Sequence, residues 1–194
     1  MSPVSRAPRT PDLPPIGAGC DSPGHWQAAD GTLVTFRPIR PDDLARERAF
    51  LDGLSAQSLY QRLLTTRKLL PGELERLTRI DRDHETAIVA TIVIDSIERQ
   101  IGVARYVREK NSTVAEFAIV IADAWQGRGL GKRLLQTLIE CAERSGITQL
   151  GGMTLAGNRE MLFLARSLGF EISMIAGDGT VRQLTRSLGS QTTA

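Results

Sequence analysis

Three glycines at alternate positions, Gly127, Gly129 and Gly131, follow an apolar segment and precede an amphipathic one. Glycine has no Cβ, so a turn built from it lets backbone N–H groups approach a phosphate closely. The first N–H groups of a helix have no partners within it, and the helix dipole places positive charge there. Arg128 and Lys132 add two cationic side chains. The pattern therefore indicates an anion site of the kind that binds phosphate groups.

The spacing of the glycines narrows the class of phosphate site. Gly-x-Gly-x-Gly differs from the Gly-x-Gly-x-x-Gly of dinucleotide-binding folds, and no Gly-Lys-Ser/Thr of a P-loop follows it. A glycine-rich turn can also be a tight connection that binds nothing. The strand before the turn, the helix after it and the basic residues favour the phosphate site over that alternative.

The elements on either side of the turn must position it. Residues 114–121 read Val-Ala-Glu-Phe-Ala-Ile-Val-Ile, which is typical of a strand. The helix after the turn carries one apolar stripe with the 3.6-residue period of a helix that lies on a core, and Gly146 ends it. The stripe consists of Leu130, Leu134, Leu135, Leu138, Ile139 and Ala142.

The rest of the chain predicts a mixed α/β sheet with helices on both faces. The expected order is strand, helices, three strands of an antiparallel meander, helix, strand, helix and a closing hairpin. Further strands are expected at Val34–Ile39, Ala87–Ile94, Gln100–Val107, Thr148–Leu155, Phe170–Ile175 and Thr180–Leu184, and further helices at 41–51, 55–64, 71–79 and 158–168.

Composition limits the class of protein. A chain of 194 residues predicts one domain, and a net charge of +2 gives no support for nucleic-acid binding. No stretch approaches the length of an apolar membrane span, and no metal-ligating pattern is present. Cys20 and Cys141 are far apart and form no disulfide pattern, which favours a reducing, cytoplasmic compartment. We expect a monomer or weak dimer.

The ends of the chain differ in composition from its middle. Six of the nine prolines lie in residues 1–31, among few bulky apolar side chains, so we expect a disordered N-terminal tail there. A domain is then expected over residues 32–188 and a short C-terminal tail over 189–194.

The segment Gln126–Gly131 matches Gln/Arg-x-x-Gly-x-Gly/Ala, the signature of the GCN5-related N-acetyltransferase (GNAT) family. The chain resembles this family from Leu33 to Leu188, and Asn158 followed by Leu168-Gly169-Phe170 fits a second family segment. The segments Leu77–Asp81, Ala115–Ala118 and Asp123–Gly129 are more specifically similar to the acetyltransferase domain of bacterial protein lysine acetyltransferases.

The resemblance implies acetyl-coenzyme A (acetyl-CoA) as donor and an amine as acceptor. It also implies a mostly antiparallel sheet whose two central strands splay apart, so that one strand edge can pair with the pantetheine amides. The pyrophosphate would then bind the N–H groups of the glycine turn, and the Ile119 N–H would polarise the thioester carbonyl. The implied cofactor-binding residues are Ile119, Val120, Ile121, Gln126, Gly127, Arg128, Gly129, Leu130, Gly131, Lys132 and Asn158.

Glu116 is the ionisable residue of the strand before the turn, and the resemblance places the catalytic base there. A lysine amine has a pKa near 10.4, which at neutral pH sets about 4 kcal/mol against its nucleophilic form. A base can assist the proton's removal, and partial burial of Glu116 would raise its pKa towards that of a useful base. Two alternatives remain. In the first, Glu116 has no catalytic role, because it faces outward or pairs with Arg105; in the second, the amine attacks without a dedicated base.

Two positions of the next helix bear on the mechanism. Asn158 can cap that helix or contact the pantetheine arm. The family's frequent tyrosine, which protonates the departing thiolate, would fall at Ala165, so no side chain serves as the acid at that position.

Together these observations predict an N-acetyltransferase that moves acetyl from acetyl-CoA to a primary amine, with a protein lysine as the favoured acceptor. A small-molecule amine acetyltransferase on the same fold is one alternative. A non-catalytic acyl-CoA-binding module is the other.

Overall fold

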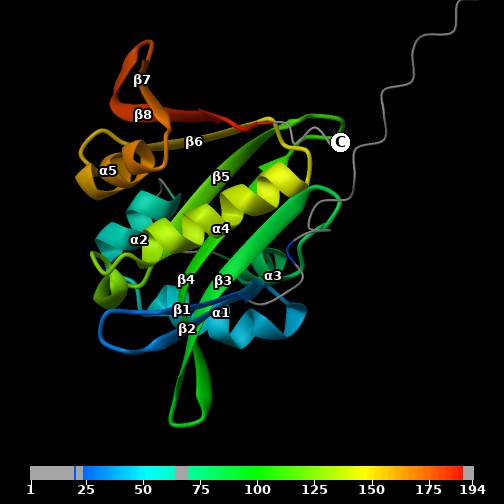
Figure 1. The fold of residues 1–194 in the computed structure, drawn as a ribbon, viewed down its shortest axis with the longest axis vertical. Coiled ribbons are helices and arrows are strands. Elements are labelled where there is room, and N and C mark those ends of the chain that lie inside the picture. Colours follow the sequence, from blue (N-terminus) through cyan, green and yellow to red (C-terminus); the bar gives the residue numbers. More distant parts are fainter. Residues whose placement is uncertain (1–19, 21–23, 64–69, 190–194) are drawn as a thin grey trace, which may run out of the picture.

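The computed structural model describes residues 20, 24–63 and 70–189. Its centre is an eight-stranded sheet in the order β1-β2-β3-β4-β5-β6-β8-β7, drawn in Figure 1. Every neighbouring pair is antiparallel except β5 and β6, which run parallel. The strands are β1 (Gly24–Gln27), β2 (Leu33–Pro38), β3 (Glu85–Ile94), β4 (Ile97–Arg108), β5 (Val114–Ile121), β6 (Gln149–Leu155), β7 (Glu171–Ile175) and β8 (Asp178–Ser187).

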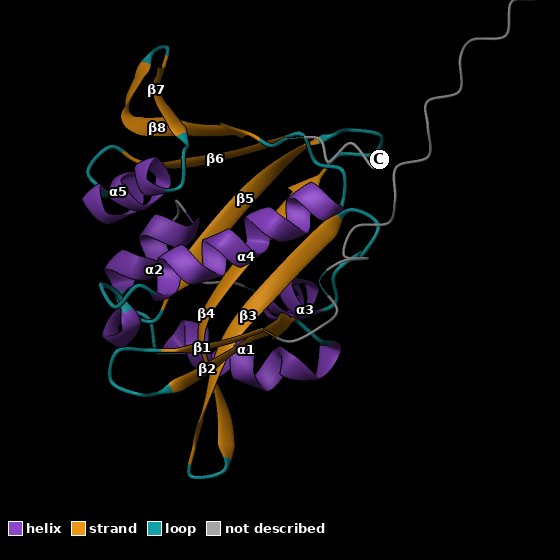
Figure 2. Cartoon of the chain, in the orientation of Figure 1, coloured by secondary structure: helices purple, strands orange, loops and turns teal. Residues whose placement is uncertain are grey.

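Helices cover both faces of the sheet, as Figure 2 shows. α4 lies across β3, β4 and β5 on one face, with α5 beside it, whereas α1, α2 and α3 cover the other face. This arrangement confirms the predicted mixed sheet and its meander. The helices are α1 (Leu44–Asp52), α2 (Ala56–Leu63), α3 (Pro71–Thr78), α4 (Leu130–Arg144) and α5 (Arg159–Ser167).

The predicted apolar stripe of α4 forms the centre of the main core. Leu130, Leu134, Leu135 and Leu138 have no exposed side-chain surface, and they pack on the inward faces of β3, β4 and β5. Burying a leucine side chain stabilises a fold by about 1.5–3 kcal/mol. The helix is therefore firmly held, and its N-terminus stays at the end of β5.

β5 and β6 splay apart, as the resemblance implied. They pair only over Val114–Glu116 with Gln149–Gly151, although β5 continues to Ile121. Gly152 lets the Phe117 ring of β5 pack against β6 just past the paired segment, because a Cβ there would lie 2.8 Å from that ring. A gap therefore opens between the two strands beyond Glu116.

The N-terminal segment differs from its prediction. Residues 24–27 form β1, which pairs with β2, so the predicted tail of residues 1–31 is wrong at its C-terminal end. Its proline and polar residues gave no sign of a strand, because this short edge strand is ordered by pairing with β2. Residues 1–19 and 21–23 lie outside the described residues, as do 190–194 of the predicted C-terminal tail.

The two cysteines also differ from their prediction. Cys20 and Cys141 form a disulfide, with Cα atoms 5.7 Å apart, and this bond links the N-terminal segment to α4. Cysteines 121 positions apart give no pattern in a sequence, because the fold alone brings them together. The cysteines therefore no longer support a reducing compartment.

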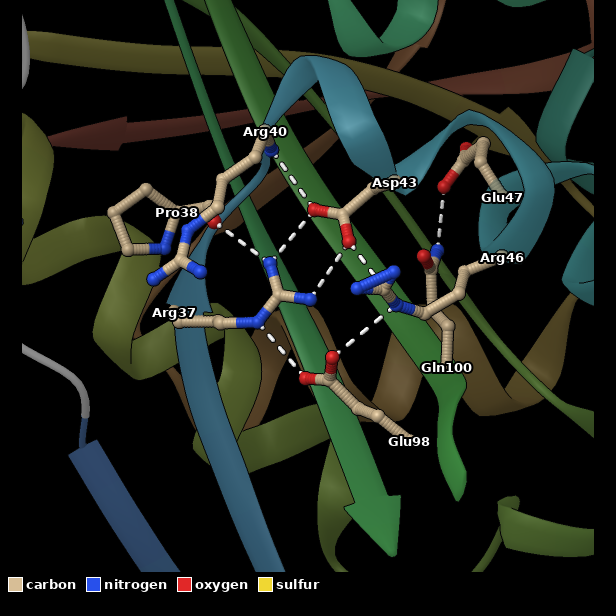
Figure 3. A network of polar contacts seen from close by, with 8 residues as sticks. All are labelled: Arg37, Pro38, Arg40, Asp43, Arg46, Glu47, Glu98 and Gln100. Carbon is tan, nitrogen blue, oxygen red and sulfur yellow. Dashed lines mark hydrogen bonds and ion pairs between the residues drawn. The ribbon is translucent and has the colours of Figure 1, made fainter. Parts of the chain in front are cut away.

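A buried ion-pair network fixes the entry to α1, shown in Figure 3. Arg37 on β2 donates two parallel hydrogen bonds to Asp43, each 2.7 Å long, and a third to Glu98 at 2.9 Å. Asp43 also accepts from the Arg40 backbone N–H, and Glu98 accepts from Arg46. Burial opposes ionisation of Asp43, but the Arg37 guanidinium and the Arg40 N–H outweigh it and hold the pKa of Asp43 below its usual value.

Asp43→Ala should lower the free energy of unfolding by about 3–5 kcal/mol, because it leaves the buried Arg37 without its main partner. The depressed pKa of Asp43 gives stability that is present above about pH 4 and is lost as the pH falls through the folded-state value. The difference between wild type and variant should therefore shrink from pH 7 to pH 3 in urea unfolding. Asp42→Ala, at the exposed neighbouring position, is the control. Equal losses for the two variants would contradict the role of the network.

Candidate functional site

The free edge of β5 faces the gap. The Ala122 N–H donates to Ile101 on β4, and backbone direction alternates along an antiparallel strand, so Ile121 and Ile119 direct their backbone groups away from β4. The Ile121 carbonyl accordingly accepts from the Gln126 side chain at 3.1 Å. β6 does not pair with this part of β5, so Ile119 presents an N–H and a carbonyl to the gap. By the same alternation the backbone of Val120 points towards β4, which differs from its expected role.

The glycine turn connects this edge to α4. Gly127 and Gly129 have φ values of 69° and 87°, which lie in the left-handed region that favours glycine. α4 begins at Leu130, and its first intrahelical bond runs from the Arg133 N–H to the Gly129 carbonyl. The N–H groups of residues 130–132 are therefore left for a ligand or for water. The sequence prediction of a helix N-terminus behind a glycine turn is confirmed.

A cavity of about 440 Å³ follows the gap. On one side of β5 it reaches the glycine turn and α5, and on the other it reaches α2. Its polar residues come from the glycine turn, α2, α5 and β6, and its apolar lining comes from β5, α5, β6 and β8. The lining includes Ser58, Gln61, Arg62, the strand residues 117–121, Gln126, Gly127, Gly129, Gly131, Lys132, Met153, Thr154, Asn158, Glu160, Met161, Phe163 and Leu164.

A chain of hydrogen bonds holds α2 against the turn. Asp123 accepts from the Ser55 N–H at 2.9 Å and from the hydroxyls of Ser55 and Ser58, each at 2.7 Å. Gln126 donates to the Ser58 hydroxyl at 3.0 Å as well as to Ile121. Burial opposes ionisation of Asp123, but the bonds from Ser55 and Ser58 outweigh it and lower its pKa. Gln126 therefore joins β5 to α2 and forms one wall of the cavity.

Glu116 lies at the last paired position of β5, opposite Gly151 of β6 and Val107 of β4. Its side chain is exposed, on the face that carries α1, α2 and α3, and it stands just outside the lining. Glu116 therefore faces outward, which is one of the alternatives that the sequence left open, and it lacks partial burial. Arg105 pairs in register with Ala118 and donates to the Leu77 carbonyl, so the alternative pairing with Glu116 is not formed.

The other predicted residues divide into two groups. Lys132 and Asn158 line the cavity, and Asn158 also caps α5 by accepting from the Met161 N–H at 3.1 Å. Arg128 and Leu130 are outside the lining. Arg128 pairs with Asp30 at 3.1 Å and lies over the Trp125 ring, whereas the Leu130 side chain is buried in the core.

Four further positions bear on the site that the sequence predicted. Ala165 is fully buried in the main core, so that position does not open on the cavity. Ser58, Gln61 and Arg62 line the cavity although the sequence indicated only a helix there. Spacing gives no signal for them, because their approach to β5 depends on Asp123 from a distant part of the chain.

Comparison with known proteins identifies this arrangement. The model of the acetyltransferase (GNAT) family matches residues 55–170. An acetyltransferase of Pseudomonas aeruginosa is 36% identical over 149 residues, which are 75% of this chain and 80% of that protein. The chain belongs to the GNAT family.

Further relatives place the GNAT chain among several kinds of acetyltransferase. Acetyltransferase Pat of Mycolicibacterium smegmatis is 32% identical over 145 residues. The match covers 74% of this chain but only 43% of Pat. The GNAT domain of S. lividans PAT superposes with a TM-score of 0.75 at 26% identity, covering 86% of this chain and 97% of that one. A phosphinothricin acetyltransferase of Sinorhizobium meliloti in complex with acetyl-CoA shares the fold, with a TM-score of 0.65 at 22% identity over 83% and 91% of the chains.

This GNAT protein is therefore an acetyl-CoA-dependent N-acetyltransferase. The residues present fit that donor: a strand edge with free amide groups lies beside a helix N-terminus that a glycine turn leaves open. Within residues 20, 24–63 and 70–189, no cluster of side chains suits a metal ion, and no helix is long and apolar enough to cross a membrane.

Gly127→Ala should weaken acetyl-CoA binding at least about tenfold, because its Cβ would stand where the turn's amides must approach a phosphate. The left-handed φ should also cost about 1–2 kcal/mol of stability. Gly177→Ala is a matched control, since Gly177 has a φ of 82° and, like Gly127, open space where an alanine Cβ would lie, but it belongs to the β7–β8 turn. Calorimetric titration with acetyl-CoA should separate the two variants. Equal affinities would contradict the assigned role of the turn.

Proposed function

We propose that this enzyme acetylates the side-chain amine of a protein lysine, with Glu116 as the general base. The observation that carries the proposal is the position of Glu116 at the point where β5 leaves β6. Its exposed carboxylate stands at the mouth of the gap, on the face that holds α2. An acceptor arriving from solvent meets this group before it reaches the free strand edge.

The chain's own groups suit each proton and charge in the transfer. Acetyl-CoA supplies the thioester carbonyl that the amine attacks. Glu116 accepts the proton of the amine, directly or through one water molecule. The Ile119 N–H lies about 10 Å further along the strand, at 3.3 Å per residue, and donates to the carbonyl oxygen as negative charge develops there. Ala165 has no acidic group, so the thiolate leaves unaided or takes its proton from water or from another group.

The amides of residues 127–132 are proposed to hold the pyrophosphate of the donor. Hydrogen bonds to a charged partner contribute about 1.5–3 kcal/mol each, so three or four of them would anchor the cofactor. Lys132 adds a cation at the cavity wall, and the Asn158 amide group adds a donor beside the pantetheine path. Arg128 is paired with Asp30, so we assign it no direct contact with the donor.

A long, flexible lysine side chain fits the exposed approach to Glu116, and the segments around Glu116 and Asp123 resemble those of bacterial protein lysine acetyltransferases. A small-molecule amine is the second candidate. A relative named L-methionine sulfoximine/L-methionine sulfone acetyltransferase, from Pseudomonas aeruginosa, is 41% identical over 58 residues and favours it.

Glu116→Gln should lower kcat about 100- to 1,000-fold, because the amide keeps the shape of the side chain and cannot accept the proton. The acetyl-CoA affinity should stay within about twofold, since the carboxylate is outside the cavity lining. Glu171→Gln, at an exposed glutamate on β7, is the control. Thiol release over pH 6–10 provides the measurement. Wild-type turnover in Glu116→Gln would remove Glu116 as the base.

The acceptor itself can be found with labelled acetyl-CoA. Incubation of the enzyme with cellular proteins should place label on particular lysine side chains, as read by mass spectrometry of tryptic peptides. Glu116→Gln supplies the background of non-enzymatic acetylation. Label at the background level on proteins, together with rapid turnover of free amino acids, would replace the protein acceptor with a small molecule.

A further inference from the structure

Two arginines lie behind β5, on the face that carries α1, α2 and α3. Arg62 projects from α2 and lines the cavity, and it is partly buried. Arg105 projects from β4 opposite Ala118, another lining residue, and only 8% of its surface is exposed. Glu47 of α1 lies close enough to act on both charges. Arg62 therefore forms part of the cavity wall away from the glycine turn, and Arg105 lies outside the lining but near enough to act on the charge of Arg62.

The described residues leave this pair short of negative charge. Neither arginine makes an ion pair within 4 Å in the part of the chain that the structure describes. Arg105 donates to the Leu77 carbonyl, but its buried Nε has no hydrogen-bond partner among the described residues. Glu85, the other carboxylate near Arg105, is bonded to Arg76. Among the described residues, the single carboxylate of Glu47 therefore lies near two guanidinium groups.

Burial is the largest influence on the pKa of each group in this cluster. Burial and the like charge of Arg105 lower the pKa of Arg62 to about 10, against a smaller opposite effect of Glu47. Burial also lowers the pKa of Arg105. For Glu47, burial raises the pKa despite the hydrogen bond that it accepts from Gln100, a pair seen in Figure 3. A charge removed from water without a counter-charge is unfavourable, so an anion entering the cavity would be bound there.

The position of the pair indicates which molecule brings the anion. The donor's phosphates are assigned to the glycine turn, on the opposite side of β5. Arg62 and Arg105 are on the same side of the sheet as Glu116, because Glu116, Ala118 and Val120 alternate onto that face. Because the proposed acceptor approaches past Glu116, we assign the anionic group to the acceptor molecule.

We propose that Arg62, with Arg105 behind it, is an anion subsite that binds a carboxylate of the acceptor. The enzyme thereby selects amines that carry a carboxylate near the reacting nitrogen. On a protein, this is a lysine beside an aspartate or glutamate; on a small molecule, it is an amino acid. The inference rests on the proposed function, which brings an acceptor amine to Glu116.

Matched acceptors test the subsite. A peptide with one lysine is offered with aspartate or with asparagine beside it, and leucine is compared with leucinamide. One of the two pairs, the peptides or the amino acids, resembles the natural acceptor. For that pair, wild-type kcat/KM should be at least about tenfold higher with the carboxylate compound than with its amide, as expected for a charge-assisted hydrogen bond. Arg62→Gln should bring that ratio within about twofold of one, and Arg62→Lys should retain part of it.

Arg48→Gln is the control, because Arg48 is an exposed helical arginine on α1. It should keep the wild-type ratio. Thermal melting and acetyl-CoA titration of each variant show whether the fold and donor site survive. If Arg62→Gln does not fold, the kcat/KM ratios of wild type and Arg62→Lys test the subsite in its place. The subsite also predicts that propionate inhibits competitively against the acceptor.

Four results would overturn the subsite. Equal rates for both members of every pair would reject it and leave acetyl transfer to an amine intact. A preference that persists in Arg62→Gln would reject the role of Arg62. A preference of wild type for succinyl-CoA over acetyl-CoA that Arg62→Gln abolishes would move the carboxylate to the donor. Bound acetyl-CoA with no amine acetylated would instead reject the proposed function, and the subsite with it.

Discussion

The unpaired edge of β5 is the constraint on which the site depends. Buried backbone N–H and carbonyl groups need partners, and β6 supplies them only as far as Glu116. Beyond that point a sheet of this kind must either close or bind something that offers amide-like groups. Two contacts fix the surroundings of this edge: Gln126 caps the Ile121 carbonyl, and Asp123 holds α2 against the turn. The cavity is therefore a product of strand pairing that stops early.

The N-terminal segment supports the other half of the site. Its disulfide reaches Cys141 on α4, while Trp26 lies close to Gly129 and Asp30 pairs with Arg128. These contacts run along the helix whose N-terminus carries the turn. The sequence showed none of them, because Arg128 was expected to meet a phosphate and residues 1–31 were expected to be a tail. Contacts between distant segments have no period or spacing that a sequence displays.

Local patterns, by contrast, predicted the fold well. The stripe of α4, the meander and the closing hairpin follow from hydrophobic periods, and the glycine turn follows from the need for positive φ. The sequence left the surroundings of individual side chains open. Glu116 faces outward, which was one of its alternatives, the backbone of Val120 points to β4 and not to the gap, and Arg62 lines the cavity from a helix whose sequence marks no site. Each depends on which neighbour the fold brings near.

We infer that the free edge of β5 and the first amides of α4 bind the donor together. Amide hydrogen exchange with and without saturating acetyl-CoA measures this residue by residue. Protection should rise at Ile119 and at residues 129–132, and should stay the same at Val120, whose N–H is directed to β4. Bound acetyl-CoA with unchanged exchange at Ile119 and at the turn would contradict the account.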